Sequence, residues 1–530
     1  MMNDNSTIAT EETDMMSFVD VGEVLKDGSL SMRVLPKHNV ICVGSTMTTT
    51  QICVNIKARE LPDDTRAPVD IIVALDVSGS MAGRKLDLCK LTLEQLLCML
   101  LPKDRFGLVS YDTDARIELA PQKMTGANKA KALRIIKALT HRSMTNISAA
   151  IGLATQEMNA IEEPNAVRSI FLLTDGHPNQ GVSDTAGLVE ITKNSISNTH
   201  FEADLDIGAE KKTHRFSFFH GAQNKAGPGT DKVPMEVSPK SMRHPITMNC
   251  FGYGSDHNGT LLSELATAAS GSYYFVENDS SVGTAFGDAL GGVLSVVGQN
   301  VVVNIKVAPE GAPLGAEIVS VLHKGALMRE NGAYSVTVGD FFAEETRDVL
   351  FEVKLASPTT VSLAPVPHAI VSMAYTDTIL KRPVQVSPKI CNIVRADGTE
   401  VSEANIHVVA QWIRVYASRE IENAETQASR NDLEGARATI LKIRAMIFEQ
   451  DANIQSHELV KMIVKDLDEV EKGLVSTQTY ANFGSKEMCS RKMGYRTQRC
   501  AEAEPGRQER NLYRSSAQAR MANMMQIKHP

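Results

Sequence analysis

The feature that most constrains the fold is a series of apolar segments, beginning at Val69, that alternate with segments of helical spacing. The strand candidates are, in order, VDIIVALD, RFGLVSY, SIFLLTD, ITMNCFG and SYYFV. Helix candidates such as KLDLCKLTLEQLLCML and residues 128–139 lie between them, and a helix near 280–297 closes the series. Strands that are apolar along their whole length are buried on both faces, and intervening helices permit parallel pairing. We therefore predict an α/β domain with a doubly wound, mostly parallel sheet over residues 68–297.

Segments that alternate apolar and polar residues lie on both sides of this domain. QICVNIK (51–57) and DVLFEVKL (348–355) each place their apolar residues on one face. The termini of a compact domain often lie close together, so one domain can be inserted into another. We predict that the α/β domain is inserted into a β-sandwich formed by residues 17–66 and 299–397. Two separate small β units are the alternative.

The remaining segments differ from these in composition. Residues 1–16 are polar and are expected to form a disordered leader, and residues 403–475 have the apolar spacing of a helical hairpin or small bundle. Residues 476–530 are expected to form a basic, flexible tail, because ten Lys or Arg against four Glu follow from Ser485 onwards. Residues 197–245 lack a sustained period and are predicted to be an irregular insertion in the α/β domain, either functional or disordered.

Composition argues against several classes of function. The chain has 55 Lys and Arg against 63 Asp and Glu, a net charge of −8, so a nucleic-acid-binding protein is not expected. No stretch supplies about 18 consecutive apolar residues, so no membrane span is expected. The acidic N-terminus does not resemble a secretion signal, and we expect an intracellular, cytoplasmic protein. The eight cysteines include no CxxC pair, which favours small buried hydrophobic residues over a zinc ribbon or a disulfide framework.

Candidate metal ligands follow the first strand of the α/β domain. The segment VDIIVALDVSGSM gives Asp76, Ser78 and Ser80 a D-x-S-x-S spacing. In open α/β sheets, ligands bind at the carboxyl ends of the strands, where neighbouring loops are expected to add Thr145 from SMTNIS and Asp175 from SIFLLTDG. Carboxylate and hydroxyl oxygens are hard donors that suit Mg²⁺ or Mn²⁺.

These segments carry a resemblance to a known family. Through DVSGSM, DRFGLVSYD, TNIS and LLTDG, residues 68–297 resemble a von Willebrand factor type A (VWA) domain. The resemblance implies a metal-ion-dependent adhesion site (MIDAS) whose ligands, direct or through water, are Asp76, Ser78, Ser80, Thr145 and Asp175. Two aspartates formally neutralise a divalent cation, so the ion keeps an exchangeable position that an Asp or Glu of a protein partner can fill. A purely structural metal, or an empty site, is the alternative.

The flanking segments resemble, less specifically, the Vwaint arrangement of intracellular type A proteins, which include plant RING-finger ubiquitin ligases. No RING finger can be built here, because its closely spaced Cys and His ligands are absent. We predict a non-enzymatic, metal-dependent protein-interaction module or scaffold. The alternative is a constitutive accessory subunit of a larger complex, ubiquitin-ligase-associated, chelatase-like or channel-associated. A metal-dependent hydrolase using His177 as its base remains as a third interpretation.

Overall fold

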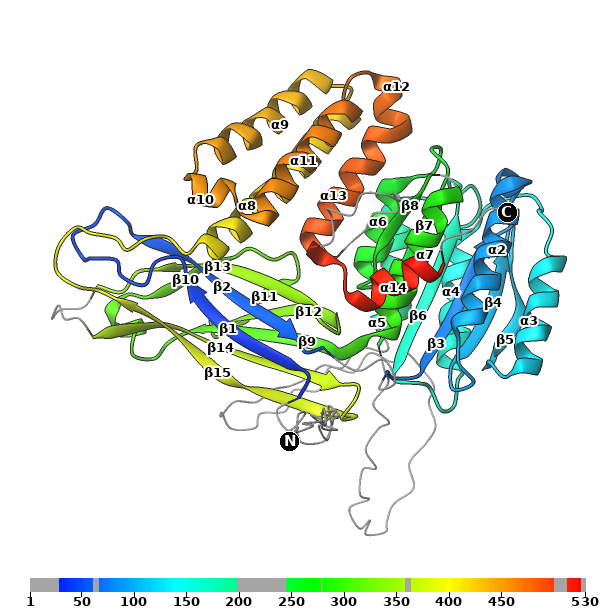
Figure 1. Ribbon diagram of the computed structural model, residues 1–530, viewed down its shortest axis with the longest axis horizontal. Helices are drawn as coiled ribbons and strands as arrows, with labels where there is room; N and C mark the ends of the chain where they lie inside the picture. Colours follow the sequence, from blue (N-terminus) through cyan, green and yellow to red (C-terminus); the bar gives the residue numbers. More distant parts are fainter. Residues whose placement is uncertain are drawn as a thin grey trace, which may run out of the picture.

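The described residues form three units: an α/β domain, a β-sandwich and a group of C-terminal helices (Figure 1). The computed structural model describes residues 28–60, 66–197, 245–277, 279–357, 364–499 and 512–525. The predicted leader and nearly all of the predicted insertion lie outside the described residues. No helix in the described part of the chain is long and apolar enough to cross a membrane.

A six-stranded sheet forms the centre of the α/β domain, with the strand order β5-β4-β3-β6-β7-β8. Its strands are β3 (Val69–Asp76), β4 (Arg105–Tyr111), β5 (Ala115–Lys123), β6 (Val167–Thr174), β7 (Ile246–Tyr253) and β8 (Tyr273–Val276). All neighbours are parallel except β4 and β5. The central strands β3 and β6 are buried throughout, as their continuous apolar sequences require. The predicted mostly parallel sheet is confirmed.

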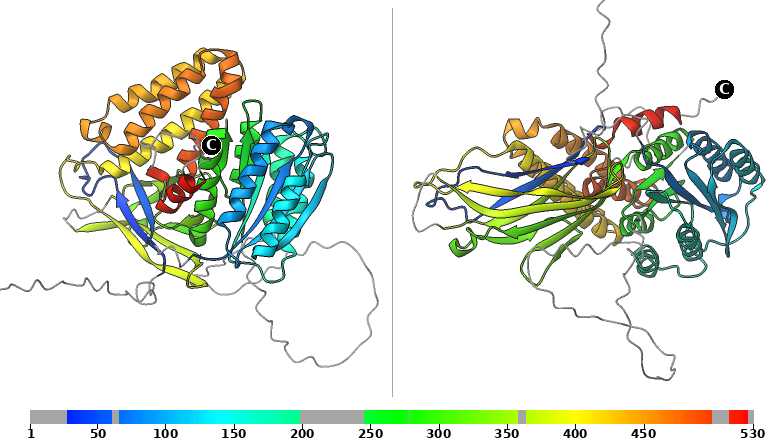
Figure 2. Two further views of the ribbon diagram at one scale, coloured as in Figure 1. Left: turned by 45° about the vertical axis from the view of Figure 1, so that its right-hand side comes forward. Right: turned by 90° about the horizontal axis from the view of Figure 1, so that it is seen from below.

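Helices cover both faces of this sheet (Figure 2). They are α2 (Arg84–Met99), α3 (Gly126–Ala138), α4 (Ile147–Asn159), α5 (Thr185–Ser197), α6 (Gly259–Ala268) and α7 (Asp279–Leu294). The apolar residues of α2, α3 and α7 pack on one face, and those of α4, α5 and α6 pack on the other. The sheet is therefore doubly wound.

Strands from before and after the α/β domain form two antiparallel sheets, ordered β1-β2-β13-β10 and β11-β12-β9-β14-β15. The first contains β1 (Leu30–Pro36), β2 (Thr49–Ala58), β10 (Glu317–Val321) and β13 (Thr346–Lys354). The second contains β9 (Val296–Val307), β11 (Ala326–Met328), β12 (Tyr334–Phe342), β14 (Pro365–Asp377) and β15 (Arg382–Val394). Their apolar faces share one core. The α/β domain is thus inserted into a β-sandwich, between β2 and β9.

The strand register separates the two faces of the first sheet. Val54 on β2 pairs with Val349 on β13, and both side chains belong to the sandwich core. Side chains alternate along a strand, so Cys53 and Leu350 lie on the opposite, outer face. There they pack against Val408 of the helix α8 (Ile406–Ser429). One face of the sheet therefore fills the sandwich, and α8 covers part of the other.

The C-terminal helices begin with α8, α9 (Leu433–Phe448), α10 (Ala452–Gln455) and α11 (Glu458–Gly473). The buried apolar residues of α9, from Ala436 to Ile447, pack into a core shared with α8 and α11, as the helical spacing of residues 403–475 predicts. Trp412 stacks on Tyr416 with ring centroids 5.4 Å apart and packs beside this core. This segment is a small helical bundle.

The prediction of a flexible tail over residues 476–530 is wrong for the residues that the structure describes there. They form α12 (Thr477–Thr479), the short π-helix η4 (Tyr480–Gly484), α13 (Ser485–Thr497) and α14 (Ser516–Met524). α14 packs so closely on α7 that a Cβ at Gly287 would lie 2.3 Å from the Cα of Ala522. Only a glycine permits this approach. The tail is built into the molecule on both the helical bundle and the α/β domain.

Ion pairs explain why a basic sequence folds here. Lys492 lies 2.5 Å from Glu425, and Arg514 lies 2.6 Å from Asp288. In both pairs the acidic partner belongs to an element earlier in the chain. Acidic residues of earlier elements therefore balance the excess positive charge of residues 476–530. Counting charges within that segment alone does not reveal this balance.

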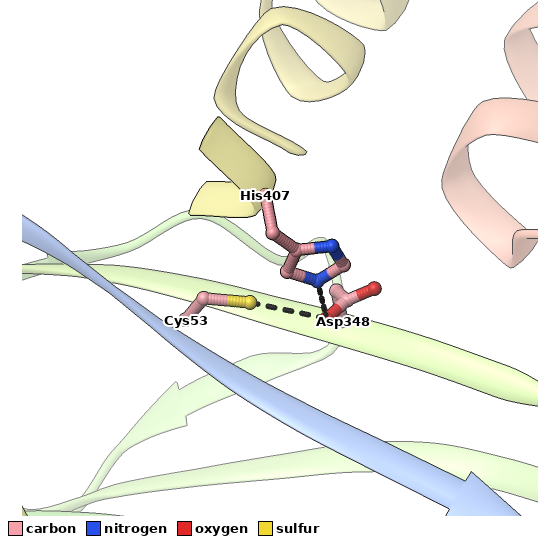
Figure 3. Close-up of side chains that lie close together, drawn as sticks. All are labelled: Cys53, Asp348 and His407. Atoms are coloured by element: carbon pink, nitrogen blue, oxygen red, sulfur yellow. Dashed lines mark hydrogen bonds and ion pairs between the residues drawn. The ribbon is translucent and has the colours of Figure 1, made fainter. Parts of the chain in front are cut away.

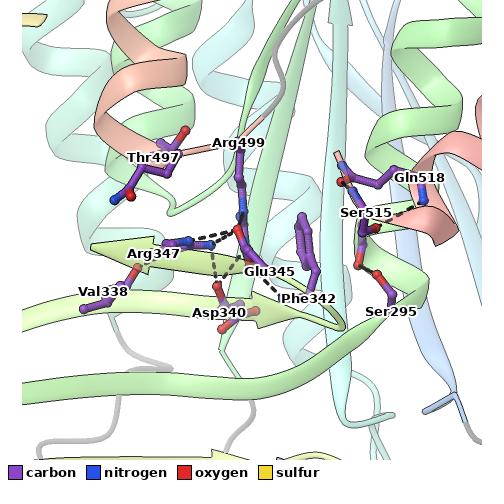
Figure 4. Close-up of polar contacts among 12 residues, drawn as sticks. Ser295, Val338, Asp340, Phe342, Glu345, Arg347, Thr497, Arg499, Ser515 and Gln518 are labelled. Atoms are coloured by element: carbon purple, nitrogen blue, oxygen red, sulfur yellow. Dashed lines mark hydrogen bonds and ion pairs between the residues drawn. The ribbon is translucent and has the colours of Figure 1, made fainter. Parts of the chain in front are cut away.

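A buried polar network joins the end of α13 to the sandwich (Figure 4). Arg499 Nε donates to Glu345 Oε1 at 2.9 Å, and Arg347 Nη2 donates to the same oxygen at 2.8 Å. Burial opposes the charge of Glu345, but the two guanidinium groups prevail and lower its pKa. Arg499 also donates to the Asp340 carbonyl at 2.8 Å and stacks 3.7 Å above the Phe342 ring. The end of α13 is held by charge, hydrogen bonding and stacking together.

Candidate functional site

The residues predicted to bind metal lie on three loops at the carboxyl edge of the central sheet. Asp76 ends β3, and Ser78 and Ser80 follow it in a loop that contains the short helix η2 (Gly79–Met81). Asp175 directly follows β6, which is the parallel neighbour of β3. Thr145 comes just before α4. Parallel neighbours end at the same edge of a sheet, so Asp76 and Asp175 are brought together although they are far apart in sequence.

Hydrogen bonds join the first and third loops. Asp76 Oδ1 accepts from the backbone N–H of Ser78 at 2.8 Å, which folds the D-x-S-x-S loop back on its carboxylate. The hydroxyl oxygens of Ser78 and Ser80 lie 3.1 Å apart, and Ser80 Oγ donates to Asp175 Oδ1 at 2.8 Å. Four of the five predicted ligands thus form one connected set.

The Thr145 loop closes on the same point. Two hydrogen bonds fix its backbone. The Thr145 N–H donates to Asn179 Oδ1 at 2.8 Å, and the Thr145 carbonyl accepts from the Asn179 N–H at 3.1 Å. A Cβ at Gly176 would lie 3.4 Å from Thr145 Oγ1 and 3.7 Å from Asp76 Oδ2. Gly176 therefore marks where the three loops meet. All five predicted residues are gathered at this edge of the sheet.

Asp76 accepts hydrogen bonds from neutral groups alone among the residues that the structure describes. Its side chain is fully buried, and Thr174 Oγ1 donates to Asp76 Oδ2 at 2.6 Å. Burial raises the pKa of Asp76 to about 6; the Thr174 and Ser78 hydrogen bonds oppose the rise, and the charge of Asp175 adds to it. The donors among the described residues are neutral, so a bound cation would stabilise this carboxylate.

Lys85 is the residue of this site that the sequence analysis missed. Its ammonium group forms an ion pair with Asp175 Oδ2 and lies 3.2 Å from Asp256 Oδ1. Burial disfavours the charge of Lys85, but these carboxylates prevail and raise its pKa. A lysine in the first turn of α2 is disfavoured by the helix dipole unless an acidic partner is near, and that is the signal by which it could have been found.

The donor set fits a hard divalent cation. It contains two carboxylates and three hydroxyls, all oxygen, as Mg²⁺ and Mn²⁺ prefer. Lys85 supplies one positive charge at Asp175 and would compete with such an ion. His177, the sequence candidate for a catalytic base, has its Nε2 3.0 Å from the Asp256 carbonyl oxygen. The arrangement can hold a cation at an exposed sheet edge, where the Ser80 side chain reaches the surface.

Two relatives of known sequence resemble most of the chain. E3 ubiquitin-protein ligase WAV3 of Arabidopsis thaliana is 25% identical over 346 residues, which are 63% of this chain and 39% of that protein. The uncharacterized protein sll0103 of Synechocystis sp. is 23% identical over 423 residues, 78% of this chain and 87% of that protein. The match thus spans about two fifths of the length of the plant protein.

A solved structure and a family match agree with the fold. The von Willebrand factor type A protein from Catenulispora acidiphila superimposes with a TM-score of 0.59 at 14% identity, covering 87% of this chain and 96% of that one. Residues 70–288 match the sequence family of the von Willebrand factor type A domain. Together with the mostly parallel sheet that helices cover on both faces, these matches identify residues 70–288 as a von Willebrand factor type A domain.

Proposed function

We propose that the protein is a binding module whose type A domain holds Mg²⁺ or Mn²⁺ and through it captures an acidic side chain of a protein partner. The observation that carries this proposal is the meeting of the oxygen-bearing side chains of Asp76, Ser78, Ser80, Thr145 and Asp175 at one edge of the sheet. Type A domains are protein-interaction modules, and Ser80 is the exposed residue of the proposed site.

Charge balance supports an acidic ligand. Asp76 and Asp175 formally neutralise a divalent ion, while the hydroxyl ligands add no charge, so the bound ion would still attract a carboxylate. The whole chain has a net charge of −8, which gives no long-range attraction for an acidic partner. Recognition would then depend on short-range contact at the metal, and it would be lost with the metal.

The proposed function is a binding function without a catalytic step. We propose that the protein acts inside the cell. The seven cysteines that the structure describes are free thiols, six of them buried. Free thiols are typical of a reducing compartment. His177 is hydrogen-bonded to a backbone carbonyl, which gives the hydrolase interpretation no support.

Metal titration of the full chain tests the proposal. Mg²⁺ and Mn²⁺ binding would be measured by calorimetry for the wild type, Asp76→Ala and Asp87→Ala. Asp87 is a matched control because it is exposed on α2. We expect Asp76→Ala to weaken binding at least about 100-fold, since losing even an outer partner of a ligand costs 10–100-fold, and Asp87→Ala to leave it nearly unchanged. Equal binding by all three proteins would refute the metal site.

A second candidate function is a constitutive subunit of a ubiquitin-ligase complex. The observation in its favour is the similarity to WAV3 over 63% of this chain. Partners captured from native lysate in Mg²⁺, in chelator and with Asp76→Ala would separate the two functions. Metal-dependent capture loses its partners in both chelator and mutant. A constitutive subunit keeps the same partners, at fixed stoichiometry, in all three conditions.

A further inference from the structure

A second group of side chains that could bind a metal ion lies on the outer face of the first sandwich sheet, away from the type A domain. Cys53 on β2, Asp348 on β13 and His407 in the first turn of α8 bring one ligand atom each within 4.8 Å of one another (Figure 3). Among the described residues, this is the one group of three His, Cys, Asp or Glu side chains that meets that distance.

The register of the sheet explains how two of these residues meet. Asp348 pairs directly with Asn55, and Cys53 is two residues from Asn55 on the same face. This face points away from the sandwich core, where a free cysteine and an aspartate would ordinarily meet solvent. Here α8 covers it and adds His407 from above. The cluster therefore depends on the docking of the helical bundle onto the sheet.

The contacts converge on one oxygen atom. Asp348 Oδ1 accepts from Cys53 Sγ at 3.1 Å, from His407 Nε2 at 2.8 Å and from Asn55 Nδ2 at 2.9 Å. Cys53 and Asp348 are buried, whereas the His407 side chain keeps 33% of its surface exposed. The cluster is thus closed on the sheet side and open to solvent at the histidine.

We propose that Cys53, Asp348 and His407 form a zinc site, distinct from the metal site of the type A domain. Thiolate, imidazole and carboxylate are zinc ligands, and three protein ligands leave a fourth position for water. Tetrahedral zinc at bond lengths of about 2.0–2.3 Å holds its ligand atoms roughly 3.3–3.6 Å apart. Asp348 Oδ1, at 3.1 Å from Cys53 Sγ and 2.8 Å from His407 Nε2, would move away from each by about half an ångström. The sulfur and the nitrogen, which lie within 4.8 Å of each other, would adjust to the same spacing through the partly exposed His407.

Protons and charge balance in this exchange. Zinc replaces the thiol proton of Cys53, which leaves to solvent. The proton that His407 Nε2 donates to Asp348 also leaves to solvent, which frees the Nε2 lone pair for the ion, and the neutral ring keeps or regains one proton on Nδ1. One thiolate and one carboxylate neutralise the ion. Arg414 donates to the Asp348 carbonyl at 3.2 Å, so a charge-neutral metal centre avoids adding positive charge beside that guanidinium.

The ligand chemistry separates the two sites. The type A domain offers oxygen only, which suits Mg²⁺, whereas this cluster offers sulfur and nitrogen, which favour Zn²⁺ or Co²⁺. The cluster also joins strands before and after the type A domain to the first turn of α8. A bound ion would fasten the helical bundle to the sandwich at its point of entry. The inference does not depend on the proposed function.

Cobalt titration tests the site. The full chain, reduced and freed of metal, would be titrated with Co²⁺ in excess Mg²⁺, which fills the oxygen site. We expect about one equivalent of Co²⁺ to produce the near-ultraviolet absorption of a thiolate–cobalt bond, and Zn²⁺ to remove it. Cys53→Ser and His407→Gln should each weaken binding at least about 100-fold. A folded wild type without this absorption would overturn the proposal.

Two controls locate the signal. Cys98 is an exposed free cysteine, so Cys98→Ser tests adventitious binding, and Asp76→Ala tests the type A site. Both should keep the cobalt absorption of the wild type, and a signal that follows Cys98 would overturn the proposal. If Cys53→Ser does not fold, His407→Gln decides, because its side chain is partly exposed at a helix end. Wild-type affinity in that variant would also overturn it.

Discussion

Asp76 and Asp348 are both buried aspartates at candidate metal sites, yet their pKa values move in opposite directions. Burial raises the pKa of Asp76 to about 6, because only neutral donors oppose it. Burial acts in the same way on Asp348, but hydrogen bonds and charge from His407, with further donors from Asn55 and Cys53, prevail and lower its pKa. The difference lies in the neighbours, since both side chains are removed from water.

This contrast separates two ways of using a buried carboxylate. Among the described residues, the hydrogen-bond donors to Asp76 are neutral, so its buried charge is destabilising and a bound cation would relieve that cost. Asp348 accepts hydrogen bonds from its neighbours, so it already stabilises the fold. A metal ion bound there would have to displace the hydrogen atoms of those bonds from Cys53 and His407. We therefore expect the first site to contribute binding and the second to contribute stability, with or without zinc.

The largest expected effect is that of Asp348→Ala. Removing the carboxylate leaves buried donors of Asn55 and Cys53 without their acceptor, which should cost about 2–4 kcal/mol in the free energy of unfolding. Because the folded pKa is lowered, the contribution is fully present above the unfolded value of 3.8 and is lost as the pH falls through the folded pKa. Urea denaturation at pH 7 and at pH 3 measures both. Lys354→Ala, at an exposed end of β13, is the control.

Asp76→Asn should raise the free energy of unfolding when metal is chelated, whereas Asp348→Ala lowers it. The rise from 3.8 to about 6 corresponds to about 3 kcal/mol of destabilisation at neutral pH, and Asn removes the charge while keeping an acceptor. Since the folded pKa is raised, the penalty is absent below pH 3.8, grows between 3.8 and about 6, and is complete above that range. Denaturation in chelator at pH 4 and pH 7 would reveal a gain only at pH 7. A loss of stability at pH 7 would contradict the contrast.

Lys85→Met should give the smallest of the three effects. Lys85 places a positive charge at Asp175, where a divalent ion would bind, so its removal should strengthen Mg²⁺ binding about 10-fold, a size that allows for its partial exposure. Calorimetry measures the change, with Lys90→Met on the same helix as control. Weaker Mg²⁺ binding by Lys85→Met would mean that the lysine supports the site instead of competing with the ion.

The sequence predicted that the five candidate ligands of the type A domain meet at one edge of the sheet, because that arrangement follows from local rules. Strand ends of a parallel sheet meet at one edge, and Asp76, Asp175 and the loop hydroxyls each follow a recognisable apolar segment. Lys85 escaped because its partner Asp175 is 90 residues away and only the folded sheet joins them. The motif of metal ligands therefore does not reveal the Lys85 ammonium group, which competes with a metal ion for Asp175.

The Cys53 cluster could not be predicted, because its three residues belong to three elements with no common spacing. Residues 53 and 348 meet only through the pairing of β2 with β13, and His407 joins them only when α8 docks. The prediction of a flexible tail was wrong for a related reason. Its basic residues appear solvated in the sequence, and only the folded structure places acidic partners beside them, such as Glu425 beside Lys492. Long-range pairing decides both features.

The insertion of the type A domain has a consequence for how the protein is made. Cys53 on β2 and Asp348 on β13 are neighbours in the sheet, yet 295 residues separate them. At about 5–20 residues per second, a ribosome needs roughly 15–60 s to synthesise the chain between them. During that time β2 has only β1 to pair with, while the complete type A domain emerges and can fold. Closure of the sandwich is therefore a late event, and the apolar face of β2 is the surface that a chaperone would have to protect.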